Sequence, residues 1–196
     1  TDATVTLNKD DKVVKKGYIK TDGTRVETFY DNKKKTKEIT RYPGGDTRTR
    51  VYDDKGRVSD EKFDDLNTHY EYYGDTDTKK TETLNFDGSK GFTTKYYNKE
   101  GVPTKSITKK ADGKTEKTTF DPDHYEREIS TIYYDTDGKT KTGSEEFIYG
   151  NNEYFAQKIV SKDSTGNITG VRTREFAKDA NENTYVKKEV YKDEMN

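Results

Sequence analysis

The sequence is 196 residues long, contains no cysteine, and has a net charge of −1 from 37 basic and 38 acidic residues. Without cysteine there can be no disulfide framework, thiolate metal site or cysteine nucleophile. The near-zero net charge excludes the simplest case for nucleic-acid binding, which needs a basic excess.

Apolar residues are too few for a conventional hydrophobic core. Leu, Ile, Val and Phe make up about 15% of the chain, and less than about 20% is typical of disorder. Order is nevertheless indicated, because the balanced charge avoids self-repulsion and the 16 Tyr and 8 Phe rings suit a half-exposed sheet. At about 25 cal/mol per Å² of buried apolar area, this composition supports only thin cores. A repeat fold, in which each unit covers only its neighbour, satisfies that limit.

Turn signals recur about every ten to fifteen residues and divide the chain into short segments. Asp-Gly and Gly-Asn pairs supply the positive φ that tight hairpin turns require. In chain order the predicted turns are residues 21–23, 42–45, 53–56, 86–88, 98–101, 111–113, 135–138, 149–152 and 164–167. The runs between them are rich in Thr, Tyr, Val, Ile and Phe, which favour strands. These connections are too short for the crossovers that parallel strands need.

An aromatic residue often ends a predicted strand just before its turn. In chain order these rings are Tyr30, Tyr42, Tyr52, Phe63, Tyr73, Phe86, Tyr97, Phe120, Tyr134, Tyr149 and Phe176. Most steps are about 10 to 14 residues, so two strands make a hairpin repeat of about 22 residues.

The sequence therefore predicts an all-β fold without significant helix. We expect an elongated antiparallel β-meander of repeated hairpins, with about 14 strands. Residues 1–196 form a single repeat domain in this interpretation. Its repeats become more irregular from about residue 161, with a longer loop at residues 178–183.

Neither face of the predicted strands is cleanly apolar. In residues 24–30, Val26 and Tyr30 share a face with two threonines, while Phe29 shares the other face with charged residues. The hydrophobic-in, polar-out signature of a sandwich is missing. Cross-strand pairs, at about 0.2–1 kcal/mol each, would then carry much of the stability. We predict a largely single-layer or thin sheet.

The segment Tyr52-Asp53-x-x-Gly56-Arg57-Val58 resembles the YD repeat of bacterial Rhs-type surface and toxin-shell proteins. The wider pattern is similar to the hairpin repeats of bacterial MORN-variant proteins. Lys/Glu/Thr-rich hairpins with few core residues also resemble the single-layer sheet of the Lyme spirochaete's outer surface protein A. Such motifs specify hairpins rather than activities. The resemblance implies a bacterial surface or secreted repeat protein and transfers no functional residue.

Five tyrosines form the predicted binding surface: Tyr70, Tyr72, Tyr73, Tyr96 and Tyr97. They become neighbours if consecutive hairpins stack. Exposed tyrosine is favoured at interfaces because it gives a large contact area at low entropy cost. The alternative is that these rings cover neighbouring strands of their own sheet.

Histidines and basic clusters give no catalytic signature. A catalytic histidine needs a positioned acid and a nucleophile, and no such set is recognisable around His69 or His124. We predict a solvent-facing strand position for His69 and a turn for His124. Residues 33–35, Arg48 and Arg50 are basic but flanked by acidic residues, which favours a solvated face over an anion site.

Two acidic segments, residues 75–77 and the loop that begins at Asp135, are similar to calcium loops. Glu146 would take the final ligand position of the second loop. Lys139, however, stands at a ligand position and Thr140 where glycine is required. We therefore favour an ordinary hairpin turn and expect no metal or other cofactor.

These observations predict a non-enzymatic, secreted or cell-surface β-repeat protein that acts as a structural spacer or adhesin-like binding module. The expected partner is a protein, a glycan or a second copy joined through strand edges. The alternative is an intracellular interaction or immunity-type repeat protein that binds a protein partner.

Neither nucleic acid nor a membrane span is expected for this chain. No signal peptide is recognisable, and no apolar run approaches the roughly 20 residues of a membrane span. Thr1 could follow a cleaved leader or the boundary of an expressed fragment.

Overall fold

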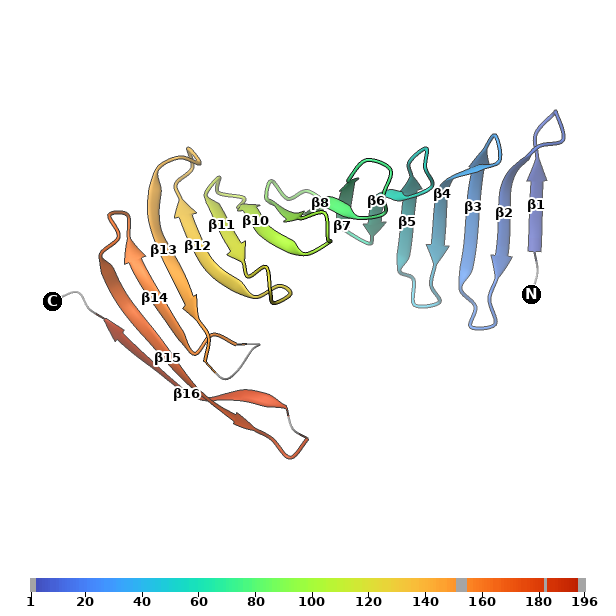
Figure 1. Ribbon diagram of the computed structural model, residues 1–196. Coiled ribbons are helices and arrows are strands. Elements are labelled where there is room, and N and C mark those ends of the chain that lie inside the picture. The colour runs from blue at the N-terminus through green and yellow to red at the C-terminus, as the bar shows by residue number, and fades with distance from the viewer. Residues whose placement is uncertain (1–2, 151–154, 182, 194–196) are drawn as a thin grey trace. The chain divides into compact units, whose positions relative to one another are not determined.

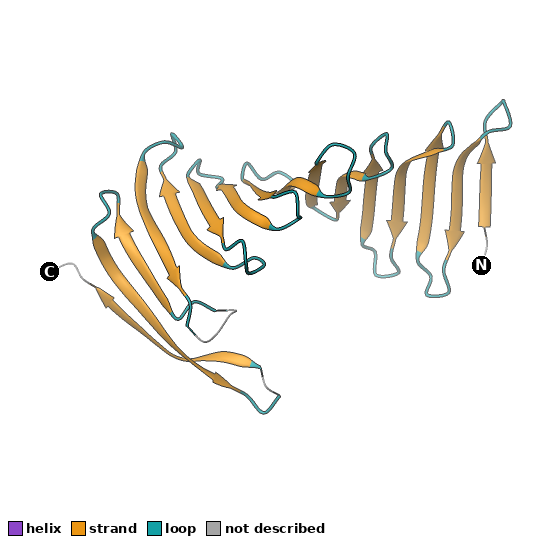
Figure 2. Ribbon diagram, viewed as in Figure 1, coloured by secondary structure: helices purple, strands orange, loops and turns teal. Residues whose placement is uncertain are grey.

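The computed structural model describes residues 3–150, 155–181 and 183–193, and all of its regular elements are β-strands (Figures 1 and 2). Its contacts divide the chain into two compact units. Unit 1 comprises Thr1–Thr94 with Lys99–Gly101, and unit 2 comprises Lys95–Asn98 with Val102–Asn196. The single repeat domain stays a prediction. Thr1 and residues 151–152 of the predicted turn 149–152 lie outside the described residues.

The strands follow one another with short connections throughout. Unit 1 holds β1 (Ala3–Leu7), β2 (Val13–Ile19), β3 (Arg25–Asp31), β4 (Lys34–Arg41), β5 (Thr47–Tyr52), β6 (Val58–Phe63), β7 (Leu66–Tyr72) and β8 (Lys79–Phe86). β9 (Phe92–Tyr97) is divided between the units. Unit 2 holds β10 (Pro103–Lys109), β11 (Thr115–Phe120), β12 (Glu128–Tyr134), β13 (Lys141–Ile148), β14 (Lys158–Asp163), β15 (Ile168–Lys178) and β16 (Thr184–Asp193).

The sheet topology is a simple meander. Sixteen strands form one sheet in which each strand is hydrogen-bonded to its sequence neighbours, from β1 to β16. The predicted all-β antiparallel meander is confirmed, with sixteen strands in place of about fourteen. No helix long and apolar enough to cross a membrane occurs among the described residues.

Five of the glycine turns predicted from the sequence share one closing pattern. At residues 53–57 the N–H of Asp53 donates to the carbonyl of Arg57 at 2.8 Å, and the N–H of Gly56 donates to the carbonyl of Asp53 at 3.0 Å. Gly56 has a φ of 84°. Such a three-residue loop with a left-handed third residue fits the twist of the flanking strands. The same two bonds close residues 20–24, 42–46, 110–114 and 163–167.

Two turns without glycine were indicated in the sequence only by the rings of Tyr30 and Phe63, which precede them. Asn32 and Lys33 join β3 to β4 with φ values of 47° and 69°, and Asp64, at 51°, begins the two-residue turn between β6 and β7. Asn and Asp tolerate the left-handed region better than most residues because their short polar side chains can bond locally.

Several strand-ending aromatics lie beside a β-bulge. The register shifts next to Tyr30, Tyr52, Tyr72, Phe120 and Tyr134. A bulge bends its strand and redirects the side chain.

Several of the predicted strand boundaries need correction. Tyr42, Tyr73 and Tyr149 each lie one residue beyond the end of a strand, because β4, β7 and β13 stop at Arg41, Tyr72 and Ile148, and Phe176 lies inside β15. The predicted long loop at residues 178–183 is shorter, because β15 continues to Lys178 and β16 begins at Thr184. Residue 182 lies outside the described residues.

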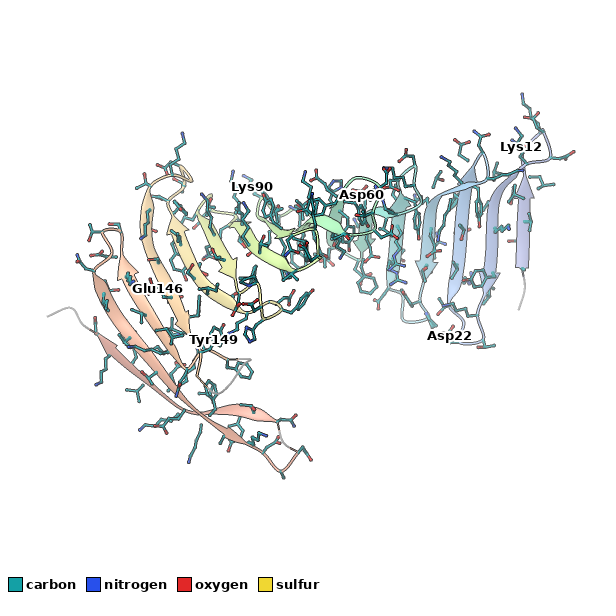
Figure 3. The ribbon with its side chains drawn as sticks, viewed as in Figure 1. Lys12, Asp22, Asp60, Lys90, Glu146 and Tyr149 are labelled. Carbon is teal, nitrogen blue, oxygen red and sulfur yellow. The ribbon has the colours of Figure 1, made fainter. Side chains whose placement is uncertain are left out.

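Threonine provides much of the thin core. The buried apolar residues are Val26, Tyr97, Pro103, Phe120, Ala156, Ile159 and Val160, and the buried polar residues are Thr24, Thr28, Thr40, Thr68, Thr81, Ser106 and Thr131. Buried hydroxyls find partners across strands: the Oγ1 atoms of Thr118 and Thr131 are 2.9 Å apart. Side chains project from both sides of the sheet (Figure 3).

One face of unit 1, which we call the charged face, carries a cross-strand row in which acidic and basic side chains alternate between two threonines. The row consists of Thr28, Glu38, Arg50, Glu61 and Thr68, each directly opposite the next on β3 to β7. Arg50 forms an ion pair with Glu61. Because the row includes Thr28 and Thr68, which are buried, the charged side chains beside them help to cover the sheet.

Adjacent glycines in the β4–β5 turn provide a matched test of this architecture. Gly45 has a φ of 101°, whereas Gly44 has no positive φ, and a Cβ at either position meets nothing within 4 Å. We expect Gly45→Ala to lower the free energy of unfolding by about 1 kcal/mol through backbone strain. Gly44→Ala should be neutral or stabilise by about 0.4–1 kcal/mol. Urea unfolding measures both, and equal effects would contradict the assigned turn.

Candidate functional site

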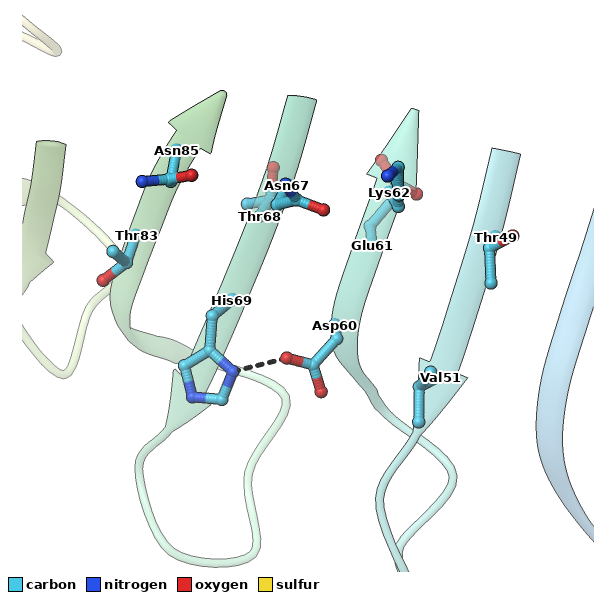
Figure 4. A pocket seen from close by; sticks show the side chains of 10 residues that line it. All are labelled: Thr49, Val51, Asp60, Glu61, Lys62, Asn67, Thr68, His69, Thr83 and Asn85. Carbon is cyan, nitrogen blue, oxygen red and sulfur yellow. Dashed lines mark hydrogen bonds and ion pairs between the residues drawn. The ribbon is translucent and has the colours of Figure 1, made fainter. Parts of the chain in front are cut away.

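A shallow groove of about 220 Å³ lies over β5 to β8 of unit 1 (Figure 4). We call it the β5–β8 groove. Its lining consists of Thr49, Val51, Asp60, Glu61, Lys62, Asn67, Thr68, His69, Thr83 and Asn85. Most of these side chains can form hydrogen bonds.

Strand register arranges the groove residues in two cross-strand rows. One row is Val51, Asp60, His69 and Thr83, and the other is Thr49, Lys62, Asn67 and Asn85. Residues directly opposite one another have Cβ atoms about 4.5–5.5 Å apart. The two rows lie on the face opposite the charged face, because they alternate along the strands with Glu61 and Thr68.

Asp60 and His69 form the central polar pair of the groove. Nδ1 of His69 lies 2.7 Å from Oδ1 of Asp60, and the Ser59 hydroxyl donates to Oδ2 at 2.8 Å. Burial alone would raise the pKa of Asp60, but the hydrogen bonds from His69 and Ser59 outweigh it and lower that pKa. Both side chains remain about half exposed, at 53% for Asp60 and 55% for His69.

The order of these groups does not match a serine hydrolase triad. In a triad the imidazole lies between the serine hydroxyl and the carboxylate and accepts the hydroxyl proton. Here the carboxylate of Asp60 lies between Ser59 and His69. The Ser59 hydroxyl also contacts the carbonyl of Val51 at 3.4 Å. This arrangement orients hydrogen-bonding groups and does not activate Ser59 as a nucleophile.

Asp87 organises the other end of the groove. Lys62 pairs with Asp87, and Nδ2 of Asn67 donates to it at 2.6 Å. These two hydrogen bonds lower the pKa of Asp87. Nδ2 of Asn85 donates to the carbonyl of Gly91 at 3.0 Å. Since both amide nitrogens are used within the chain, the side-chain oxygens of Asn67 and Asn85 are left as acceptors for a ligand.

Tyr70 and Tyr72 lie on the charged face, away from the two groove rows. Lys79 stands 4.6 Å from the ring centroid of Tyr70, and Arg57 stands 4.4 Å from that of Tyr72. The Tyr72 hydroxyl donates to the carbonyl of Val58 at 2.7 Å. Burial raises the pKa of both phenols. These contacts match the strand-covering alternative considered from the sequence.

Tyr73, Tyr96 and Tyr97 occupy different settings. Tyr73 belongs to the turn after β7, in unit 1, whereas Tyr96 and Tyr97 are successive residues of β9 in unit 2. Successive strand residues point to opposite faces, and Tyr97 is only 7% exposed. Tyr97 is therefore a core residue, and binding through the five-tyrosine surface stays a prediction.

The predicted turn positions are found at His124 and Asp137. His124 lies between β11 and β12, with Nδ1 2.9 Å from Oδ2 of Asp121. Oδ1 of Asp137 accepts the N–H groups of Lys139 and Thr140, both at 2.8 Å, as in a hairpin turn. Across the described part of the chain, no group of three or more His, Asp or Glu side chains is placed to hold a metal ion.

The predicted solvated basic face is correct for only part of its residues. Lys33 and Lys34 are exposed. Lys35, Arg48 and Arg50 are instead half-buried on β4 and β5. The buried Nε of Arg48 has no hydrogen-bond partner among the residues that the structure describes.

The lowered pKa of Asp60 predicts a pH-dependent contribution to stability. The charged carboxylate stabilises the fold above its ordinary pKa of 3.8, and this contribution is lost as the pH falls through the lower folded value. At pH 6 we expect Asp60→Asn to lower the free energy of unfolding by about 0.2–1 kcal/mol. The difference from wild type should vanish near pH 2. Urea titrations at both pH values test this, and a difference that grows in acid would contradict the pairing.

Comparisons with known proteins give no family assignment. No protein-family model matches the sequence, and no curated protein matches it. Among solved structures, a porin-like protein from Bacteroides uniformis is similar over 92% of this chain and 96% of its own, at 13% identity and a TM-score of 0.29. A likeness this weak supports no conclusion about fold or function.

Proposed function

We propose that this protein is a non-enzymatic β-repeat module, secreted or displayed at the cell surface, that binds a glycan in the β5–β8 groove. The two-row polar array in the groove carries this proposal. The surface location is suggested by the resemblance of its hairpins to those of bacterial surface repeat proteins. A spacer role is compatible with the same sheet, because both faces of unit 1 carry charged side chains.

The chemistry of the array suits neighbouring sugar hydroxyls, which both donate and accept hydrogen bonds. Asn67 and Asn85 offer acceptor oxygens, while Lys62 and His69 offer nitrogen donors. The charged groups already have partners within the chain, since Lys62 contacts Asp87 and the Asp60 carboxylate is hydrogen-bonded to His69 and Ser59. The groove therefore favours a neutral glycan over a strongly charged ligand.

The size of the groove and the strands that carry its lining also favour a glycan ligand. Its volume of about 220 Å³ is below the roughly 300–1,000 Å³ of enclosed small-molecule pockets. A sugar residue of a longer chain needs only an open surface. The lining side chains stand on paired strands rather than on loops, so little ordering entropy is lost on binding.

A glycan array screened with the purified protein tests the proposal. We expect a neutral glycan ligand, with affinity reduced at least about tenfold in the double variant Thr49→Val, His69→Ala, because two hydrogen-bonding groups are lost. Thr49 has no side-chain hydrogen bond to another described residue, and the His69 partner Asp60 stays solvated, so the fold should persist.

Thr21→Ala, in an exposed turn of the same unit, serves as the control and should bind like wild type. Circular dichroism would verify folding of each variant. Failure of wild type to bind any glycan, or equal binding by the double variant, would refute the assignment. A protein ligand lost in the same variant would favour the protein-binding alternative.

A further inference from the structure

A second hollow, of about 390 Å³, lies on the charged face of unit 1 beside β2 and β3. Its lining consists of Asp11, Lys12, Val13, Lys16, Tyr30 and Lys33. We call it the lysine pocket. Lys12 ends the β1–β2 turn, where Figure 3 labels it, and Lys33 belongs to the β3–β4 turn. Strand register places Lys16 opposite Thr28, so Lys16 and Tyr30 share the charged face.

The lysine pocket carries an excess of positive charge. Three lysines face one carboxylate, that of Asp11. Lys12, Lys16 and Lys33 form no ion pair with any described residue, whereas ion pairs neutralise many other cations of unit 1. The rest of the wall is apolar, since it consists of Val13, the Tyr30 ring and the methylene stems of the lysines. Such a pocket favours an anion attached to an organic body.

Other cation–tyrosine contacts of unit 1 show what this pocket lacks. In three of them the cation lies close to the ring and also pairs with a carboxylate. These are Lys35 over Tyr52 at 4.2 Å with Glu38, Arg57 over Tyr72 at 4.4 Å with Asp53, and Lys79 over Tyr70 at 4.6 Å with Glu82. Each cation is thus held between an aromatic ring and an anion.

Lys16 contacts an aromatic ring, that of Tyr30, but forms no ion pair with a carboxylate of the described residues. Its Nζ stands 5.6 Å from the Tyr30 centroid, and no carboxylate among the described residues pairs with it. Arg48 of unit 1 and Lys105 and Lys117 of unit 2 also approach tyrosines without forming an ion pair with a described residue. The lysine pocket differs from all of these contacts because two further lysines share its wall. An external anion placed there would complete the arrangement that the neighbouring strands make internally.

We propose that the lysine pocket binds an acidic sugar residue, with its carboxylate or sulfate among the three lysines and its ring against Tyr30 and Val13. Charge-assisted hydrogen bonds to lysine supply the anchoring. A volume of about 390 Å³ lies in the range of pockets that enclose organic ligands and exceeds the needs of a bare anion. The proposal is independent of the β5–β8 groove, which lies on the opposite face.

Titrations of the full chain, followed by NMR at low salt, test this site with four probes. A methyl glucuronide and a glucose sulfate present the anion on a sugar ring, a methyl glucoside lacks the charge, and inorganic sulfate lacks the ring. We expect at least one charged sugar to bind about tenfold or more tighter than both the methyl glucoside and inorganic sulfate. Its affinity should fall as salt is added, because exposed charges are screened.

The response to the two charged sugars identifies the source of the anion. Binding of the glucuronide alone would assign a carboxylated sugar, and binding of the sulfate ester alone a sulfated one; either result supports the site. Equal binding of inorganic sulfate, or no binding of either charged sugar, would overturn it.

Matched variants locate the binding. Lys16→Gln and Lys33→Gln should each lower the affinity for the charged sugar about tenfold. Lys37 is an exposed lysine of β4 outside this pocket, and Lys37→Gln should leave that affinity unchanged. The groove variant Thr49→Val, His69→Ala should also leave it unchanged, which separates failure of this site from failure of the proposed function. Wild-type affinity in the folded Lys16→Gln, Lys33→Gln double variant would refute the assignment.

Discussion

A sheet without a second layer must cover its own backbone, and this constraint governs the structure. Long side chains of adjacent strands lie over short ones, so that the polar Thr68 is 8% exposed although no apolar layer packs on it. Lysine and arginine suit this task because their stems are apolar and their charged ends remain in water. The 38% content of charged residues and the abundance of tyrosine therefore both serve the fold, although so high a charge content is also typical of disordered chains.

The two faces of unit 1 meet this constraint in different ways. On the charged face, cations stand between rings and carboxylates, as Arg57 does between Tyr72 and Asp53. On the opposite face, the groove uses short side chains such as Thr49 and Asn67, which leave the surface hollow. Candidate binding sites arise where covering is incomplete. This explains why they are shallow and why no single residue type marks them.

Much of the architecture could be predicted from local chemistry. Glycine at turn positions such as Gly56 and the rings that end many strands are properties of short segments, so strand order and sheet type follow from them. Asn32-Lys33 and Asp64-Asp65 lack that glycine, so only the preceding rings of Tyr30 and Phe63 indicated these turns. Local patterns identify a turn only when its residue types are distinctive.

The groove could not be predicted, because it depends on register between strands. Asp60 meets His69 only because the turn at Asp64-Asp65 has two residues; a slip of one residue would move either side chain to the other face. Alternation in the sequence assigns residues to faces within one strand and does not align strands. The settings of the individual tyrosines could not be predicted for a related reason. A ring such as Tyr97 has the same composition signal whether it covers a strand or faces a partner.

Contacts between strands within each unit are confined to sequence neighbours. Loop closure is then short at every step, which favours fast folding from any nucleating hairpin. Loss of one hairpin interrupts the sheet locally and leaves the pairing on either side of it intact, as in other one-dimensional arrays. Local unfolding can therefore begin at an interior hairpin as well as at either end of the sheet. Evolution could lengthen or shorten such an array by whole hairpins without redesigning a shared core.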